Sequence, residues 1–233
     1  DEEEELRELK ERIERTIEKL KEDTKKLKKE LEDRIRELKR KTKELLDDMK
    51  RLIKEVKDKG DRDEALEELA KVSEDNLRIN DEVLEELVEL AKRLLKLNVD
   101  VLDELRRLVE EILKARKDGK DRSDLERVVK ELREILDKLR KDNERVVKRL
   151  KEVLDELRRR NEESVRRLEE ILRDRNLNED IIRLVRDLIR LNREHLRDLE
   201  EAVREIIKLL REHLERLERV VDRMIRELRK AAK

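Results

Sequence analysis

Almost nothing in this chain can interrupt an α-helix, because its 233 residues include no proline and only two glycines. Gly60 and Gly119 lie at two of the three points where the apolar periodicity pauses. A glycine can adopt the left-handed conformation that ends a helix. The third pause has Asn176 in this place, and asparagine also tolerates that conformation. The three breaks divide the chain into four segments of nearly equal length.

Each break is followed by residues that typically begin a helix. The candidate N-terminal caps are Asp61 with Glu64, Ser123 with Glu126, and Asn178 with the apolar pair Leu177 and Ile182. The predicted helices cover residues about 2–59, 62–117, 123–175 and 178–231, in one domain over residues 1–233. Each helix is expected to be about 80 Å long. Connections this short make consecutive helices antiparallel, which predicts an up-down-up-down four-helix bundle.

The apolar residues repeat with a helical period. In the first predicted helix the inward positions run from Leu6 to Val56 in fourteen steps over 50 residues, which is a period of about 3.57. This period lies between the 3.5 of a supercoiled helix and the 3.6 of a straight one. The expected fold is therefore all-α, a long antiparallel four-helix bundle with weak supercoiling.

Charge and composition exclude several classes of function. Charged residues make up 57% of the chain, but 66 basic and 67 acidic residues leave a net charge of only −1. Without cysteine there is no thiol nucleophile or thiolate metal site, and without aromatic residues there is no platform on which nucleic-acid bases stack. No run of about 18 apolar residues occurs, so no segment is expected to cross a membrane. The basic stretches 25–29 and 158–160 are flanked by acidic residues and are expected to be solvated faces.

Polar residues interrupt the apolar stripe in pairs, one pair in each predicted helix. The four pairs are Thr24 and Thr42, Asn80 and Asn98, Asn143 and Asn161, and His195 and His213. The distance along the sequence between the two members is the same in all four pairs and corresponds to about five turns of an α-helix. We call this distance the repeat interval. Thr16 interrupts the same stripe, but only apolar residues lie at its level, so we expect it to bond its own helix backbone.

Folding the chain at its three breaks places these residues at two levels about 27 Å apart. The first level contains Thr42, Ser73, Asn76, Asn80, Asn161, Ser164, Asn192 and His195, and the second contains Thr24, Asn98, Asn143 and His213. A lone buried amide or hydroxyl costs about 1–3 kcal/mol, whereas grouped donors and acceptors satisfy one another. The sequence therefore predicts two structural polar networks that penalise any other helix register.

The two histidines could serve as metal ligands, as network members or as a pH sensor. Each level has a single histidine, whereas bis-histidine ligation needs two, and Asn192 stands where the Glu-x-x-His pattern of di-iron bundles needs a carboxylate. We therefore expect no metal site and, without an acid–base pair in a cleft, no catalytic residue. Burial lowers the pKa of an imidazole, so a pH-responsive role for His195 and His213 remains an alternative.

Taken together, these features resemble computationally designed helical bundles with buried hydrogen-bond networks. More closely, the chain resembles designed heterodimers of helical hairpins, here joined into a single chain. The resemblance covers all 233 residues and rests on the equal helix lengths, the Gly60 and Gly119 loops, the restricted alphabet and the two polar levels. It implies a stable scaffold with programmed pairing, no substrate and no natural biochemical function.

A natural rod-shaped protein is the alternative, but spectrin-like repeats carry aromatic residues and a long coiled coil lacks three regular breaks.

Two functional hypotheses follow from the sequence. The first is a designed structural scaffold, not an enzyme. It needs no cofactor, is monomeric, binds no nucleic acid, membrane or small-molecule substrate, and is soluble and cytoplasmic on recombinant expression. The alternative is an interaction or pH-responsive module that acts through His195 and His213 or through a displaceable first helix, with a hairpin-exchanged dimer as its assembled state. Exposure of Leu90, Leu97 or Leu196 would favour a partner.

Overall fold

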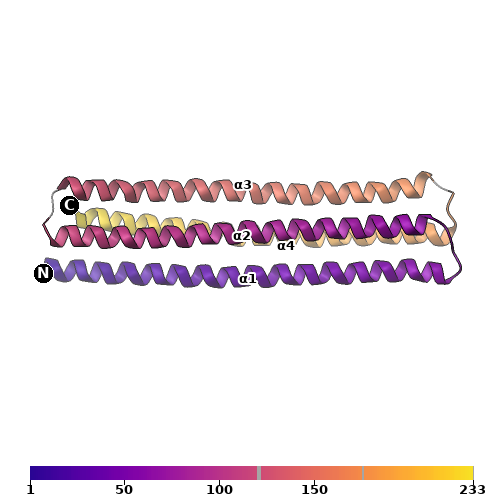
Figure 1. The fold of residues 1–233 in the computed structure, drawn as a ribbon, viewed down its shortest axis with the longest axis horizontal. Coiled ribbons are helices and arrows are strands. Elements are labelled where there is room, and N and C mark those ends of the chain that lie inside the picture. Colours follow the sequence, from indigo (N-terminus) through magenta and orange to yellow (C-terminus); the bar gives the residue numbers. More distant parts are fainter. Residues whose placement is uncertain (120–121, 175, 233) are drawn as a thin grey trace. The chain divides into compact units, whose positions relative to one another are not determined.

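A computed structural model describes residues 1–119, 122–174 and 176–232 of the chain. Four α-helices account for nearly all of them: α1 (Glu2–Asp58), α2 (Ala65–Lys117), α3 (Arg122–Asp174) and α4 (Glu179–Ala232) (Figure 1). These described residues contain no β-strand. The predicted all-α four-helix bundle is confirmed.

Contacts between the helices divide the chain into two compact units, each of which takes a segment from every helix. Unit 1 consists of Asp1–Glu30, Leu90–Lys148 and Lys208–Lys233, and unit 2 consists of Leu31–Glu89 and Arg149–Ile207. Within each unit consecutive helical segments are antiparallel, and α1 also lies beside α4. Ion pairs mark this last contact: Arg12 with Glu227 at 3.2 Å in unit 1, and Arg34 with Glu205 at 3.3 Å in unit 2.

Each unit has an aliphatic core to which all four helices contribute. In unit 1 the fully buried side chains include one from each helix, Ile17, Leu105, Leu132 and Leu217. In unit 2 the corresponding set includes Met49, Leu69, Leu168 and Leu188. Burying one such side chain stabilises the fold by about 1.5–3 kcal/mol. Because the chain contains no aromatic residue, packing of aliphatic side chains holds the helices together.

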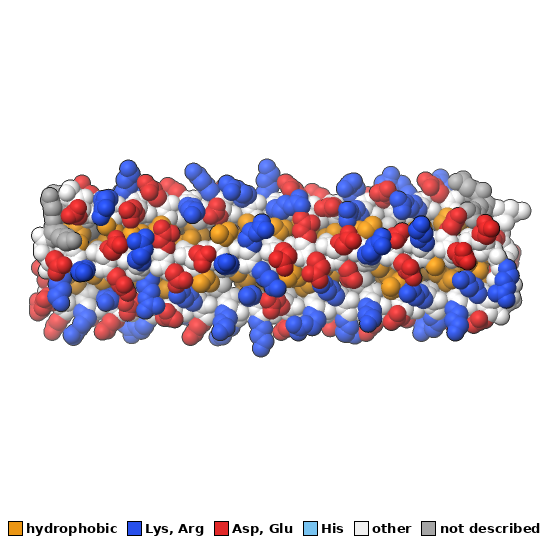
Figure 2. Space-filling model, in the orientation of Figure 1, with side chains coloured by type: hydrophobic (Ala, Val, Ile, Leu, Met, Phe, Trp, Pro, Cys, Tyr) orange, Lys and Arg blue, Asp and Glu red, His pale blue; other side chains and the backbone are white. Residues whose placement is uncertain are grey.

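The apolar side chains of both units are largely covered. No large hydrophobic side chain is exposed among the described residues, and Leu90, Leu97 and Leu196 are only partly exposed. Figure 2 shows basic and acidic side chains mixed over the face in view, with apolar side chains in narrow lines between them. This face therefore offers no large apolar patch of the kind that marks a protein–protein interface.

The two glycines end helices, as predicted. Gly60 follows α1 with a φ of 97°, and Gly119 follows α2 with a φ of 65°. Both angles belong to the left-handed region that favours glycine. The two glycine amides donate to the last turn of the preceding helix, to the carbonyl oxygens of Lys57 at 3.0 Å and Arg116 at 3.3 Å.

The start of α2 differs from the prediction. The helix begins at Ala65, three residues after the predicted start at 62. Asp63 is the cap, because its Oδ1 accepts the backbone N–H of Ala65 at 2.9 Å. Asp61 instead accepts the N–H of Asp63 at 3.1 Å and a hydrogen bond from the side chain of Asn178. The assignment of Asp61 and Glu64 as the capping pair is therefore wrong, because the carboxylate nearer the helix takes that place.

The starts of α3 and α4 lie within one residue of the predicted ones. α3 begins at Arg122 and α4 at Glu179. Asn178 caps α4, since its Oδ1 accepts the N–H of Ile181 at 2.9 Å. The predicted end of the third helix, at residue 175, lies outside the described residues.

Replacing Asp63 by alanine is expected to lower the free energy of unfolding by about 1 kcal/mol, because the first turn of α2 loses an acceptor for its N–H groups. Asp63→Ser keeps a capping oxygen and should recover most of this loss. Urea unfolding followed by far-ultraviolet circular dichroism measures both variants. Equal losses in the two variants would contradict the assignment of Asp63 as the cap.

Candidate functional site

The candidate functional site is the set of polar side chains inside the two cores. All twelve polar residues singled out from the sequence are buried, and none is more than 9% exposed. Among the described residues, no other polar or charged residue is buried to this degree. The eight residues of the first level lie in unit 2 and the four of the second level lie in unit 1. We call these two sets the unit 2 layer and the unit 1 layer.

In both layers a histidine of α4 meets a threonine of α1. His195 Nε2 lies 3.1 Å from Thr42 Oγ1, and His213 Nε2 lies 3.1 Å from Thr24 Oγ1. Each threonine hydroxyl already donates its single proton to the backbone carbonyl four residues earlier, at 2.9 Å for Thr42 and 2.8 Å for Thr24. The ring nitrogen must therefore be the donor, which places a proton on Nε2 of both imidazoles.

Burial keeps both imidazoles uncharged at neutral pH. Desolvation lowers the pKa of His195 from 6.5 to about 4, against a smaller opposing effect of Asp198. Desolvation and repulsion from Arg216 lower the pKa of His213 to about 4, opposed in part by Asp23. A charged imidazole at either place would lose its water and keep a threonine oxygen as its hydrogen-bond partner.

The unit 2 layer adds two amide pairs between helices. Asn76 Nδ2 donates to Asn192 Oδ1 at 2.8 Å and joins α2 to α4. Asn161 Nδ2 donates to Asn80 Oδ1 at 2.7 Å and joins α3 to α2. Asn161 and Asn192 each also donate to the backbone carbonyl four residues earlier, at 2.7 and 2.8 Å. Together with the threonine–histidine pair, these bonds connect all four helices of the unit.

The side-chain hydrogen bonds of the unit 2 layer form separate pairs. Ser164 Oγ donates to the carbonyl of Arg160 in its own helix at 3.3 Å. Ser73 Oγ is buried and has no partner among the described residues. Three amide atoms are likewise unpaired: Asn76 Oδ1, Asn80 Nδ2 and Asn161 Oδ1. The two serines thus make no hydrogen bond between helices in the part of the chain that the structure describes.

The unit 1 layer is smaller and its amides make different contacts. Asn143 Nδ2 donates to Glu218 Oε1 at 3.0 Å, which joins α3 to α4. Asn98 is fully buried, yet neither its Oδ1 nor its Nδ2 has a partner among the described residues. This layer therefore contains one threonine–histidine pair, one amide–carboxylate pair and one unpaired amide.

Glu218 is a hydrogen-bond partner that sequence reasoning missed. It lies five residues after His213 and is partly exposed, whereas the prediction considered only residues inside the apolar stripe. The repeat interval carried a signal, since Glu200 stands at the equivalent position after His195. The side chain of Glu200 is only 13% exposed and accepts two hydrogen bonds from Arg158, at 3.1 and 3.3 Å.

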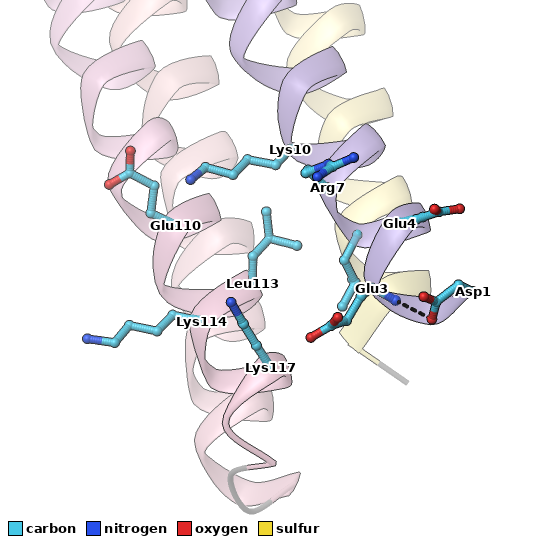
Figure 3. A pocket seen from close by; sticks show the side chains of 10 residues that line it. Asp1, Glu3, Glu4, Arg7, Lys10, Glu110, Leu113, Lys114 and Lys117 are labelled. Carbon is cyan, nitrogen blue, oxygen red and sulfur yellow. Dashed lines mark hydrogen bonds between the residues drawn. The ribbon is translucent and has the colours of Figure 1, made fainter.

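A surface depression in unit 1 lies between the first turns of α1 and the last turns of α2 (Figure 3). Leu6 and Leu113 form its apolar part. Four acidic and four basic residues surround them: Asp1, Glu3, Glu4, Glu110, Arg7, Lys10, Lys114 and Lys117. These charges balance, so they favour neither an anionic nor a cationic ligand. The lining residues include no serine, threonine or histidine and so offer no hydroxyl nucleophile with a general base.

Comparison of the chain with protein-family models, with curated proteins and with solved structures finds no match. Within residues 1–119, 122–174 and 176–232, no helix has both the length and the apolar content needed to span a bilayer. The same residues contain no group of three or more histidine or carboxylate side chains placed to hold a metal ion. We base the functional proposal on the two buried polar layers.

The histidines predict a stability that depends on pH. Between pH 6.5 and about 4 the unfolded chain binds protons at His195 and His213 that the folded chain does not, so the free energy of unfolding falls as the pH falls through this window. Each histidine contributes a slope of at most about 1.4 kcal/mol per pH unit. Urea midpoints at about pH 7.4 and about pH 5 measure the effect.

The matched control for this measurement is the double variant His195→Asn with His213→Asn. It should lose most of the pH dependence between the two buffers, because asparagine does not titrate there. A parent protein and a double variant with equal pH dependence would contradict the assignment of buried, neutral imidazoles.

Thr42→Val removes the acceptor of the His195 N–H and leaves the shape of the side chain nearly unchanged. We expect a loss of about 1–3 kcal/mol in the free energy of unfolding, because the ring donor stays buried without a partner. Thr16→Val is the control, since Thr16 is partly exposed and, as predicted, bonds the carbonyl of Arg12 in its own helix at 2.8 Å. Its effect should stay below about 0.5 kcal/mol. Equal losses in urea unfolding would show that the bond to histidine adds no stability.

Proposed function

We propose that this chain is a designed structural scaffold in which the two buried polar layers specify helix register and pairing. The observation that carries the proposal is the set of hydrogen bonds in the unit 2 layer. Thr42 with His195 joins α1 to α4, Asn76 with Asn192 joins α2 to α4, and Asn80 with Asn161 joins α2 to α3. Three bonds thus relate each helix of the unit to at least one other.

These bonds have an effect on register that apolar packing lacks. Leucine, isoleucine and valine recur every three or four residues along each helix, so a slip by one turn still brings one aliphatic side chain against another. The same slip separates Asn80 from Asn161 and removes their hydrogen bond, so that Asn161 keeps only its bond to the carbonyl of Leu157. A buried amide atom that loses its partner costs about 1–3 kcal/mol. A buried polar pair therefore selects one alignment among several that apolar contacts would accept.

Ion pairs on the surface are a weaker determinant of helix register than the buried polar pairs. Arg193 and Glu169 lie 2.8 Å apart between α4 and α3, but their side chains are 57% and 36% exposed. Exposed pairs of this kind contribute about 0–1 kcal/mol. Because 57% of the chain is charged, a slipped helix would also find new partners of opposite sign. We assign the surface charges to solubility and only secondarily to pairing.

A designed origin is supported by the regularity of the helices. The four helices have 57, 53, 53 and 54 residues, whereas helices in natural globular proteins average about 11–12 residues. The same regularity extends to the polar residues, which recur at the repeat interval in every helix. We attach no substrate, cofactor or catalytic role to the chain in this proposal.

A pH-responsive role is the second candidate, and one observation favours it. In both units the histidine of α4 bonds a threonine of α1, and burial lowers the pKa of both histidines to about 4. Protonation of either imidazole would keep its bond to the threonine oxygen but would bury a charge where α1 meets α4, so the loss of stability would fall on this contact. In this role α1 would be the element that loosens in acid, as expected for a displaceable first helix.

The register proposal is tested by replacing the four asparagines of the unit 2 layer with leucine. Leucine already occupies two equivalent positions of unit 1, since Leu94 and Leu210 lie one repeat interval after Asn76 and Asn192. Because the chain has no cysteine, Lys71→Cys on α2 and Arg166→Cys on α3 give two clean sites for spin labels at exposed positions. Pulsed dipolar spectroscopy then reports the distance between the two helices.

We expect one narrow distance distribution in the parent protein and a broad or split distribution in the leucine variant, with equal or higher thermal stability. Ser164→Val is the matched control, because Ser164 bonds only its own helix and Val146 holds the equivalent position in unit 1. The control should keep the narrow distribution. A leucine variant that also keeps it, and stays monomeric in native mass spectrometry, would contradict the proposal.

A further inference from the structure

The two layers contain the same amide pair at equivalent positions, but the pair forms a hydrogen bond only in unit 2. Asn98 lies one repeat interval after Asn80, and Asn143 lies one repeat interval before Asn161. Asn161 donates to Asn80 at 2.7 Å, whereas Asn143 donates to Glu218 instead and leaves Asn98 unpaired. The difference must come from the surroundings of the amides, because the amides themselves are the same.

The carboxylates beside these amides, Glu200 in unit 2 and Glu218 in unit 1, have different hydrogen-bond and ion-pair partners. Glu200 in unit 2 accepts two hydrogen bonds from Arg158 on α3 and lies 3.7 Å from Arg204, one turn further along α4. This carboxylate is bound by two cations and accepts no hydrogen bond from Asn161. The amide of Asn161 is therefore free to donate to Asn80 and to the carbonyl of Leu157.

Neither of these two cation contacts is repeated around Glu218. Arg140 holds the position of Arg158, but it makes no hydrogen bond or ion pair with any residue that the structure describes. The position of Arg204 is taken by Asp222, which pairs with Arg226 at 2.8 Å and repels a second carboxylate. With no cation bound to it, the carboxylate of Glu218 accepts a hydrogen bond from the amide of Asn143.

We infer that Glu218 is the residue that decides amide pairing in unit 1: a carboxylate without a cation holds Asn143 away from Asn98, and neutralising or removing it lets Asn143 donate to Asn98. This inference rests on the proposed function and deepens it, because it names a specificity-determining residue outside the apolar stripe. In unit 2 the corresponding positioning residues are Arg158 and Arg204. They leave the amide pair undisturbed by occupying Glu200.

Glu218→Ala tests the inference directly. We expect the side-chain amide protons of Asn143 to show a new nuclear Overhauser contact with Asn98 and to exchange more slowly with solvent, because their acceptor changes from a partly exposed carboxylate to a fully buried amide. Asp222→Arg is a second route, since it supplies the cation that Arg204 provides in unit 2. It should produce the same contact while Glu218 is retained.

Glu200→Ala is the matched control in unit 2. Asn161 makes no bond to Glu200, so its side-chain amide signals and its contact with Asn80 should not change. A double-mutant comparison adds a second readout. Asn98→Leu should be neutral or stabilising in the parent protein, but in the Glu218→Ala background it should raise the unfolding equilibrium constant about fivefold, because a hydrogen bond is then lost.

Unchanged Asn143 and Asn98 signals in both Glu218→Ala and Asp222→Arg would overturn the inference, and so would a change of the Asn161 signals in Glu200→Ala. These signals report one hydrogen bond and not helix register. Failure of the proposed function would appear instead in the distance distributions between α2 and α3, so the two failures can be told apart.

Discussion

The structure depends on one constraint, that a polar group inside an aliphatic core costs stability unless it meets a partner on another helix or on its own backbone. Apolar packing supplies most of the stabilisation in both units, but it accepts several alignments of helices whose leucines recur every turn. The hydroxyl, imidazole and amide groups are more selective, because each loses about 1–3 kcal/mol when it is left unpaired. Thr42 with His195 and Asn80 with Asn161 therefore join residues that are distant in the sequence and lie on different helices.

Comparison of the two units shows how strongly the pairing of two buried amides depends on the charged residues around them. Asn161 and Asn143 occupy equivalent positions, yet one bonds an amide inside the core and the other bonds a carboxylate at its edge. The charges that make this difference lie on the surface, where each contributes little to stability. Their larger effect is indirect, since a carboxylate that is held by arginine no longer competes for a buried donor. In the function that we propose, pairing specificity belongs to the buried amides and to the charged residues at the edge of the core together.

Local features of the sequence were sufficient to predict the helices and the level of each buried polar residue. The glycine positions and the short apolar period determine where helices end and which side chains turn inward, and both act over a few residues. The cap of α2 was predicted wrongly, because Asp61 and Asp63 are both good caps and the path of the turn selects between them. Glu218 was missed for a similar reason, since a rim position shows no interruption of the apolar stripe.

The sequence by itself determined four long helices, their antiparallel order and the twelve polar side chains that the core encloses. The physical reason is that helix propensity, helix breaking and burial of one face are all encoded by neighbouring residues. Only the tertiary structure decided which donor meets which acceptor. Several amides and carboxylates come within reach of one another once the helices pack, and the choice of Asn143 between Asn98 and Glu218 depends on side-chain rotamers and nearby charges contributed by other helices.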